Sequence, residues 1–237
     1  MALIWGGIAD AIFADTGTEH HEMYEHIRTV ECKIRKFHPD FKIIIVKNER
    51  YSSLKDAIVE MKFFPSPSAR YCTREFKIKP IDNYLRQFES EGVELMIGLN
   101  YDEIDKRTGN HGLLPFVNYS YPLAENGLNR NACMVILKKS GLYPNFPPYM
   151  QRGGCYMCFY KSKKEFEAMA ILDDATFDKI IDLEDCIQDQ RVEHYHVIPG
   201  IQNLREFKNQ AKAILFKPEE MYGNIELQSP CGVFCNR

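Results

Sequence analysis

The sequence predicts an α/β fold, with a mostly parallel sheet flanked by helices and a helical C-terminal region. Three observations predict this class. Short apolar and β-branched runs alternate with helical periodicities between residues 10 and 141, an alternation typical of βαβ units. Hydrophobic residues make up 45% and charged residues 27% of the 237 residues, as in globular proteins. From Ser162 onward the sequence is acidic and its periodicity is mainly helical.

The individual elements follow in order along the chain. Apolar and β-branched runs predict four strands, at Ala11–Ala14, Phe41–Val46, Val93–Gly98 and Leu114–Tyr119. Apolar residues three or four apart predict four helices, at Glu19–Lys36, Leu54–Met61, Lys77–Glu91 and Asn129–Ser140. Pro80 falls in the first turn of the third helix, where proline is tolerated. We expect an α/β domain over residues 1–161 and a helical extension with a cysteine-containing tail over residues 162–237.

Charge and hydropathy restrict the class of protein. The net charge is −3, so the chain as a whole lacks the basic character of many nucleic-acid-binding proteins. No apolar run approaches the ~20 residues of a membrane span, and Met1–Ala14 lacks the basic start of a signal peptide. We expect a cytoplasmic protein without membrane contact. Residues 126–164 hold seven basic residues and no acidic one, which favours an anionic ligand there; charges scattered over a surface are the alternative.

The eight cysteines favour metal or redox chemistry over a disulfide framework. Cys155 and Cys158 follow two glycines, and two thiolates three positions apart can bind one metal ion. Cys231 and Cys235 form a second pair, so the two pairs could make a four-cysteine site. The spacing alone leaves zinc, an iron–sulfur cluster, a redox dithiol and buried inert thiols open.

The other cysteines differ in their surroundings. Cys72 lies in a cationic turn, which is expected to lower the pKa of its thiol. Cys32, Cys133 and Cys186 lie in helical patterns, and we expect them in the core.

Two further groups of charged residues lie near expected helix starts. Arg74 and Lys77 stand three apart near an expected helix start, where two cations and the helix N-terminus would bind phosphate or sulfate; two solvated surface cations are the alternative. Asp15 and Glu19 flank a turn after the first strand, and helix capping by its threonines is the plainer role.

A third group follows the strand expected at 93–98. Asp102, Glu103 and Arg107 either position an anion or form an ordinary ion network within a loop.

Five motifs in order along the chain resemble those of one known family. They are Phe13–Glu19, Cys72–Pro80, Gly98–Glu103 with the later Arg107, Tyr121–Leu123 and Cys155–Cys158. In this order they resemble the phosphoadenosine phosphosulfate (PAPS) reductase family, a branch of the adenine-nucleotide α-hydrolase-like (N-type ATP pyrophosphatase) fold. The resemblance runs from about residue 11 to residue 161. It is strongest to phage and bacterial PAPS-reductase-like proteins and to the sulfurtransferase of DNA phosphorothioation.

The resemblance implies a function and a set of residues. It implies binding of an adenine nucleotide (PAPS or ATP), and sulfonucleotide reduction or sulfur transfer, with a thiol reductant such as thioredoxin or a sulfur donor as partner. It implies that nucleotide and anion contacts come from Asp15, Thr16, Gly17, Glu19, Arg74, Lys77, Gly98, Asp102, Glu103 and Arg107. It implies a [4Fe–4S] cluster, with zinc as the alternative, held by ligands from among Cys72, Cys155, Cys158, Cys231 and Cys235. In a reductase, Cys231 or Cys235 would be the nucleophile.

The sequence also departs from the family pattern. The family's glycine-rich phosphate loop would precede Asp15, where fourteen residues stand, and we expect the first strand–loop–helix unit to be absent. Asn100 stands where the family often has arginine. Pro230-Cys231-Gly232 shares only its Cys-Gly with the family's C-terminal catalytic segment. The alternative function is therefore a metal-stabilised module that binds a nucleotide, a nucleic acid or a partner subunit without catalysis.

Overall fold

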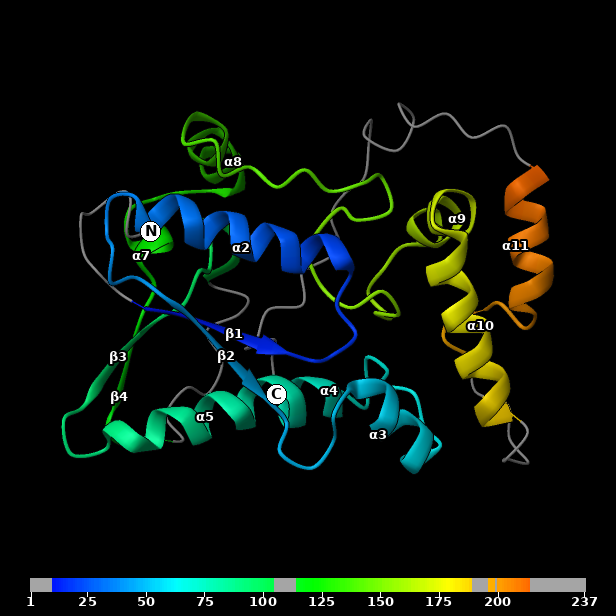
Figure 1. Ribbon diagram of the computed structural model, residues 1–237, viewed down its shortest axis with the longest axis horizontal. Coiled ribbons are helices and arrows are strands. Elements are labelled where there is room, and N and C mark those ends of the chain that lie inside the picture. Colours follow the sequence, from blue (N-terminus) through cyan, green and yellow to red (C-terminus); the bar gives the residue numbers. More distant parts are fainter. Residues whose placement is uncertain (1–9, 105–113, 189–195, 199, 214–237) are drawn as a thin grey trace.

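The computed structural model describes residues 10–104, 114–188, 196–198 and 200–213 (Figure 1). Strand β1 (Ala11–Asp15) pairs in parallel with β2 (Ile43–Lys47), and β3 (Val93–Met96) pairs in parallel with β4 (Val117–Ser120). The mixed α/β class with parallel pairing is thus confirmed. Within the described ranges the strands form two separate pairs, and the single continuous sheet that we predicted is not seen.

Helices connect the strands close to the predicted positions. Helix α2 (His21–Arg35) follows β1, α3 (Leu54–Met61) follows β2, and the short α7 (Pro122–Glu125) and α8 (Arg130–Lys139) follow β4. Capping explains where two of them begin. Ser53 Oγ accepts a hydrogen bond from the Asp56 N–H at the start of α3, and Asn129 Oδ1 accepts one from the Ala132 N–H at the start of α8.

The helical segment before β3 is longer than predicted. We expected it to begin at Lys77, but it begins at Tyr71. It runs through α4 (Tyr71–Thr73), a π-helical turn η1 (Arg74–Ile78), α5 (Lys79–Leu85) and a 3₁₀ turn η2 (Arg86–Phe88). The π turn accommodates Pro80. The Lys79 N–H reaches back five residues to the Arg74 carbonyl, and Pro80 has no N–H to donate to the Glu75 carbonyl.

A side chain from the segment that follows β2 provides a hydrogen bond to the Glu75 carbonyl. Asn48 Nδ2, just after β2, donates a hydrogen bond of 2.9 Å to the Glu75 carbonyl oxygen. The missing proline donor is therefore replaced by a tertiary contact, which ties the end of β2 to the π turn.

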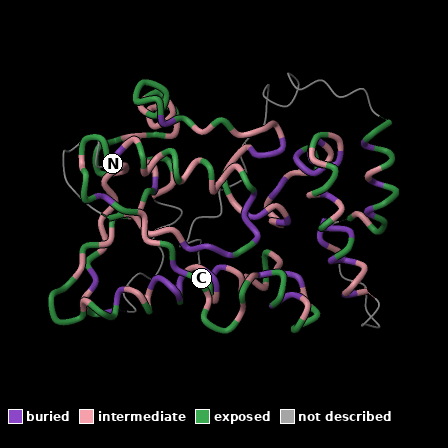
Figure 2. Tube along the Cα trace, in the orientation of Figure 1, coloured by how far each residue is buried: buried purple, intermediate pink, exposed green. Residues whose placement is uncertain are grey.

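Two hydrophobic clusters hold the fold together (Figure 2). In the smaller cluster, residues of all four strands pack with Ile81 and Leu85 of α5, so both strand pairs share one helix. The larger cluster joins α3 to the C-terminal helices α9 (Lys163–Leu172), α10 (Asp174–Gln188) and α11 (Leu204–Ala213), which lie together at one end of the molecule (Figure 1). Between residues 163 and 213, the predicted helical C-terminal region is confirmed for the residues that the structure describes.

None of the helices in the described ranges has the length and apolar character needed to cross a membrane. The expected cytoplasmic location stays a prediction.

Candidate functional site

Three of the five candidate metal-ligating cysteines line one cavity. Cys72 of α4 faces it from one side, and Cys155 and Cys158 face it from the loop before α9. The cavity has a volume of about 50 Å³ and is also lined by the cations Lys77, Arg152 and Lys161. None of its described lining residues is acidic. The fold therefore brings thiols far apart in sequence into one electropositive pocket.

The turn after β1 closes this cavity, and a glycine makes the turn possible. Gly17 has a φ of +70°, and a Cβ at this position would lie 2.8 Å from Ser53 Cβ and 3.0 Å from the Ser52 carbonyl oxygen. The Thr16 carbonyl accepts the Leu54 N–H at 2.8 Å. Only glycine combines this left-handed backbone with so close an approach to the start of α3.

Asp15 holds the turn in shape. Its Oδ1 accepts hydrogen bonds from the Gly17 N–H and from the Tyr24 hydroxyl, both at 2.8 Å, and its Oδ2 lies 3.1 Å from Lys47 Nζ. Burial alone would raise the pKa of Asp15, but these three partners outweigh it and hold the pKa below its usual value. Asp15 was predicted to contact the nucleotide, and here its carboxylate is engaged by the protein itself.

Thr16 and Glu19 contact a cysteine directly. Thr16 Oγ1 donates to Glu19 Oε1 at 2.8 Å and lies 3.1 Å from Cys155 Sγ, and the Cys155 thiol reaches Glu19 Oε1 at 3.6 Å. The backbone supports this contact, because the Tyr156 N–H donates to the Thr18 carbonyl at 3.0 Å. Burial first and then the Glu19 carboxylate raise the pKa of Cys155 well above its usual value, so its thiol is protonated in this state.

The expected pKa shift of Cys72 is wrong in sign. The cationic turn was expected to lower it, and Lys77 does act in that direction. Burial of the thiol is the larger effect, and nearby Cys158 adds to it, so the pKa of Cys72 is raised. The sequence shows the neighbouring charges but not the depth at which the thiol lies.

Lys161, one of the cations that line the cavity, is buried, and so is the nearby His20; no sequence pattern marks either as a site residue. Lys161 Nζ donates to the Tyr149 carbonyl at 3.0 Å and lies 3.8 Å from Glu165 Oε1, and burial lowers its pKa. His20 is only 2% exposed, packs against Tyr149 and Tyr156, and neither ring nitrogen has a hydrogen-bond partner among the described residues. Burial and nearby Lys161 lower the pKa of His20 to about 3.

Arg74 and Lys77 do not share a cavity. Lys77 lines the cysteine cavity, whereas Arg74 lines a second, larger cavity on another side of the same helical segment. The sequence argument assumed an ordinary α-helix, in which residues three apart lie on one face. Here both residues lie within the wider π turn, which separates them around the helix axis.

The remaining predicted site residues lie elsewhere. Gly98, Asp102 and Glu103 follow β3 and line neither cavity, and Glu103 Oε2 accepts the Asn100 N–H at 3.3 Å. Arg107, Cys231 and Cys235 lie outside the described residues. Cys32 is exposed, and Cys133 and Cys186 are only partly buried, so the expectation that these three lie in the core is wrong.

The described residues fit a thiolate-bound metal only in part. Three sulfur donors line one cavity, which is the donor chemistry of zinc and iron–sulfur sites. Within the described ranges, however, no three Cys, His, Asp or Glu side chains converge closely enough to hold a metal ion as they stand. A metal site would therefore need side-chain rearrangement and a further ligand.

Comparison with protein-family models, with curated proteins and with solved structures finds no match to this chain. We therefore infer function from the site and from the motif resemblance.

Proposed function

We propose that this chain is a PAPS-reductase-like protein of sulfur metabolism, which binds an adenine nucleotide and acts through a cysteine-ligated metal centre. One observation carries the proposal. Cys72, Cys155 and Cys158 line one cavity together with Lys77 and Thr16, which come from the motifs that resemble the family's anion-binding segments. Inert core thiols would need no such collection of cations around them.

The proposal gives these residues different roles. Cys72, Cys155 and Cys158 would hold the metal centre, and Cys231 or Cys235 would supply a further ligand or the nucleophile. Lys77 would meet the sulfate or phosphate end of the nucleotide, since its ammonium group lines the same cavity as the thiols. Thr16 and Glu19 would orient Cys155 through the contacts described above.

The chemistry differs between the two reactions proposed. In sulfonucleotide reduction, a cysteine thiolate attacks the sulfate sulfur and expels the nucleotide phosphate, leaving a cysteine S-sulfonate. A thiol of the reductant then attacks the cysteine sulfur, which releases sulfite and forms a disulfide. In sulfur transfer, ATP would adenylylate a target oxygen with release of pyrophosphate, and sulfide-level sulfur from the sulfur donor would then displace AMP from the target. An iron–sulfur centre, when bound, would place a redox-active, thiolate-ligated group near the sulfur.

The test is metal analysis of anaerobically purified protein, followed by an optical spectrum. We expect iron, acid-labile sulfide and a broad thiolate-to-iron band, and we expect Cys155→Ala and Cys158→Ala to lose all three. Cys32→Ala is the matched control, because Cys32 is an exposed thiol on α2 and lines neither cavity. Zinc alone, with no colour, would point instead to a structural metal site.

A functional assay follows for the metal-loaded protein. We expect nucleotide-dependent sulfite release from PAPS or sulfur transfer that requires ATP. If the metal-loaded protein binds nucleotide but does neither, the sulfur-metabolism proposal is wrong.

A further inference from the structure

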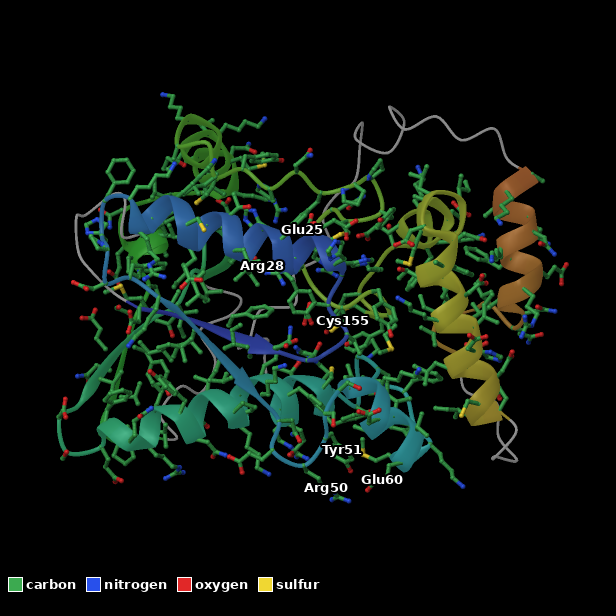
Figure 3. The ribbon with its side chains drawn as sticks, in the orientation of Figure 1. Glu25, Arg28, Arg50, Tyr51, Glu60 and Cys155 are labelled. Atoms are coloured by element: carbon green, nitrogen blue, oxygen red, sulfur yellow. The ribbon has the colours of Figure 1, made fainter. Side chains whose placement is uncertain are left out.

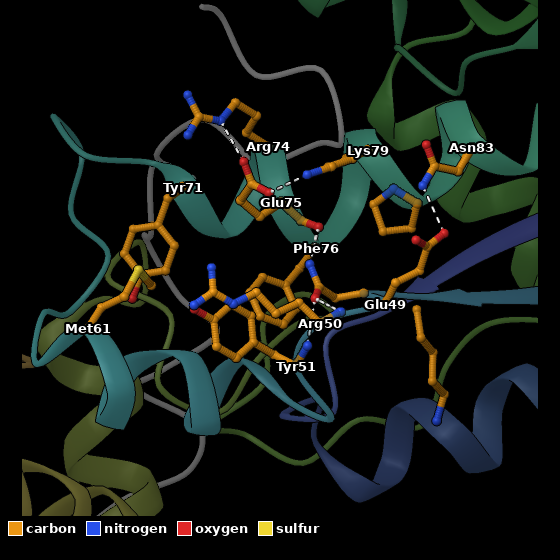
Figure 4. A pocket seen from close by; sticks show the side chains of 13 residues that line it. Glu49, Arg50, Tyr51, Met61, Tyr71, Arg74, Glu75, Phe76, Lys79 and Asn83 are labelled. Carbon is orange, nitrogen blue, oxygen red and sulfur yellow. Dashed lines mark hydrogen bonds and ion pairs between the residues drawn. The ribbon is translucent and has the colours of Figure 1, made fainter.

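The larger of the two cavities described above has a volume of about 380 Å³ and lies where β2 ends. Residues 47–51 form one wall and the helical segment from Tyr71 to Asn83 forms another (Figure 4). Small-molecule sites have volumes of roughly 300–1,000 Å³, so this cavity has room for a whole ligand, whereas the cysteine cavity, at about 50 Å³, has room for only one end of a ligand. Ligands of parallel α/β proteins commonly bind at the carboxyl ends of strands.

One side chain holds the two walls together. Asn48 Oδ1 accepts hydrogen bonds from the Arg50 and Tyr51 N–H groups, both at 2.8 Å, and Asn48 Nδ2 donates to the Glu75 carbonyl. The turn after β2 is therefore fixed against the π turn, which holds the two walls of the cavity in place.

The cavity has an apolar end and a charged end. Met61 and Tyr71 lie at one end, and Lys79 and Asn83 lie at the other, with Tyr51 between them (Figure 4). The Tyr51 ring stacks on buried Phe76, with ring centres 6.1 Å apart and an interplanar angle of 23°. Such an arrangement suits a ligand with a flat apolar part and a charged part.

Charged residues line the cavity: four cations, Lys47, Arg50, Arg74 and Lys79, and two carboxylates, Glu49 and Glu75. Lys47 and Arg50 are paired with carboxylates outside the lining, Asp15 and Glu60. Glu75 is bound by two of these cations, since Arg74 Nε lies 3.0 Å from its Oε1 and Lys79 Nζ lies 3.2 Å from its Oε2. A ligand phosphate would therefore compete with the Glu75 carboxylate for Arg74 and Lys79.

Figure 3 shows that this region is separate from the cysteine cavity. Arg50, Tyr51 and Glu60 lie together, away from Cys155 and with the α3–α4 region between. No cysteine is among the described lining residues of the larger cavity. A ligand bound in the larger cavity would therefore not contact the cysteines of the proposed thiol chemistry.

We propose that this cavity binds a phosphate that carries an aromatic ring, of the size of a nucleoside monophosphate. The ring lies at the end formed by Met61 and Tyr71, and the phosphate lies at the end that carries Lys79. The inference does not depend on the sulfur chemistry, because it uses neither the cysteines nor a metal.

The experiment is calorimetric titration of the full chain with AMP, and separately with adenosine and with ribose 5-phosphate. We expect AMP to bind more tightly than adenosine or ribose 5-phosphate, because each of these two probes fills only one end of the cavity. Lys79→Ala should weaken AMP binding about five- to tenfold, tenfold being about 1.4 kcal/mol. Glu75→Gln should strengthen AMP binding, because it removes the competing carboxylate and its repulsion of phosphate.

Further variants make the result decisive. Arg86→Ala, an exposed cation one turn beyond the cavity, should leave the affinity for AMP unchanged. If Lys77→Ala weakens AMP binding and Lys79→Ala does not, AMP binds in the cysteine cavity and the proposal is wrong. A dissociation constant for AMP above about 1 mM, or weaker binding by Glu75→Gln, would overturn it as well. Failure here would leave the metal and sulfite assays of the proposed function untouched, since they report on other residues.

Discussion

Replacing Gly17 by alanine should destabilise the protein through a clash that the structure locates. Two costs add at this position. An alanine with a φ of +70° pays about 1–2 kcal/mol for the left-handed backbone. Its Cβ would also lie 2.8 Å from Ser53 Cβ and 3.0 Å from Ser53 Cα, and overpacking of this kind costs about 1–3 kcal/mol. We therefore expect Gly17→Ala to lower the free energy of unfolding by about 2–5 kcal/mol.

Gly127→Ala is the matched control for this prediction. Gly127 has a similar φ of +64°, but a Cβ there would have no other atom within 4 Å. This variant should have the backbone cost alone. Urea unfolding, with the same dependence of the unfolding free energy on urea concentration in both variants, should therefore show Gly17→Ala to be less stable than Gly127→Ala by about 1–3 kcal/mol. Equal losses in the two variants would refute the reasoning, because they would mean that the turn after β1 moves away from α3 without cost.

Two further predictions concern polar groups near the cavities. The lowered pKa of His20 means that the unfolded chain binds the extra proton first, so stability should fall as the pH drops from 6.5 towards 3, by up to about 5 kcal/mol. His20→Phe should reduce the dependence of the free energy of unfolding on pH in this range, measured by urea unfolding, without destabilising the protein at pH 7. An unchanged pH dependence would mean that other groups cause the effect. Asn48→Ala should cost about 1–3 kcal/mol, because it leaves the Glu75 carbonyl and two N–H groups without their partner. A stability equal to that of the parent in the same urea assay would show that water replaces Asn48.

Local patterns predicted the elements well where the signal is itself local. The ranges of β1, β2, α3 and α8 depend on neighbouring residues, and the sequence predicted them to within two residues. The start of the helix at Tyr71 was missed because the rule for proline assumes α-helical hydrogen bonding. The π turn that carries Pro80 also depends on Asn48, a residue distant in sequence, to satisfy the Glu75 carbonyl.

The candidate site was only partly predictable for a similar reason. The residue types that favour a thiol site are visible in sequence, and Cys72, Cys155 and Cys158 do line one cavity. Burial is not visible there. Burial decides the direction of the Cys72 pKa shift, and neither ring nitrogen of buried His20 has a hydrogen-bond partner in the described part of the chain. No single-sequence signal marks His20, because its tyrosine neighbours lie more than a hundred residues away.

The parallel pairing of the strands has a consequence for how the chain folds. Ala11 pairs with Ile43 and Val93 pairs with Val117, so neither pairing described here can form as a local hairpin. Each requires the chain between the two strands to fold back before the first ladder hydrogen bond forms, and the entropy of closing that loop is lost before any contact compensates for it. Folding kinetics should therefore be slow, and they should depend on whether α5, which packs against both strand pairs, forms early.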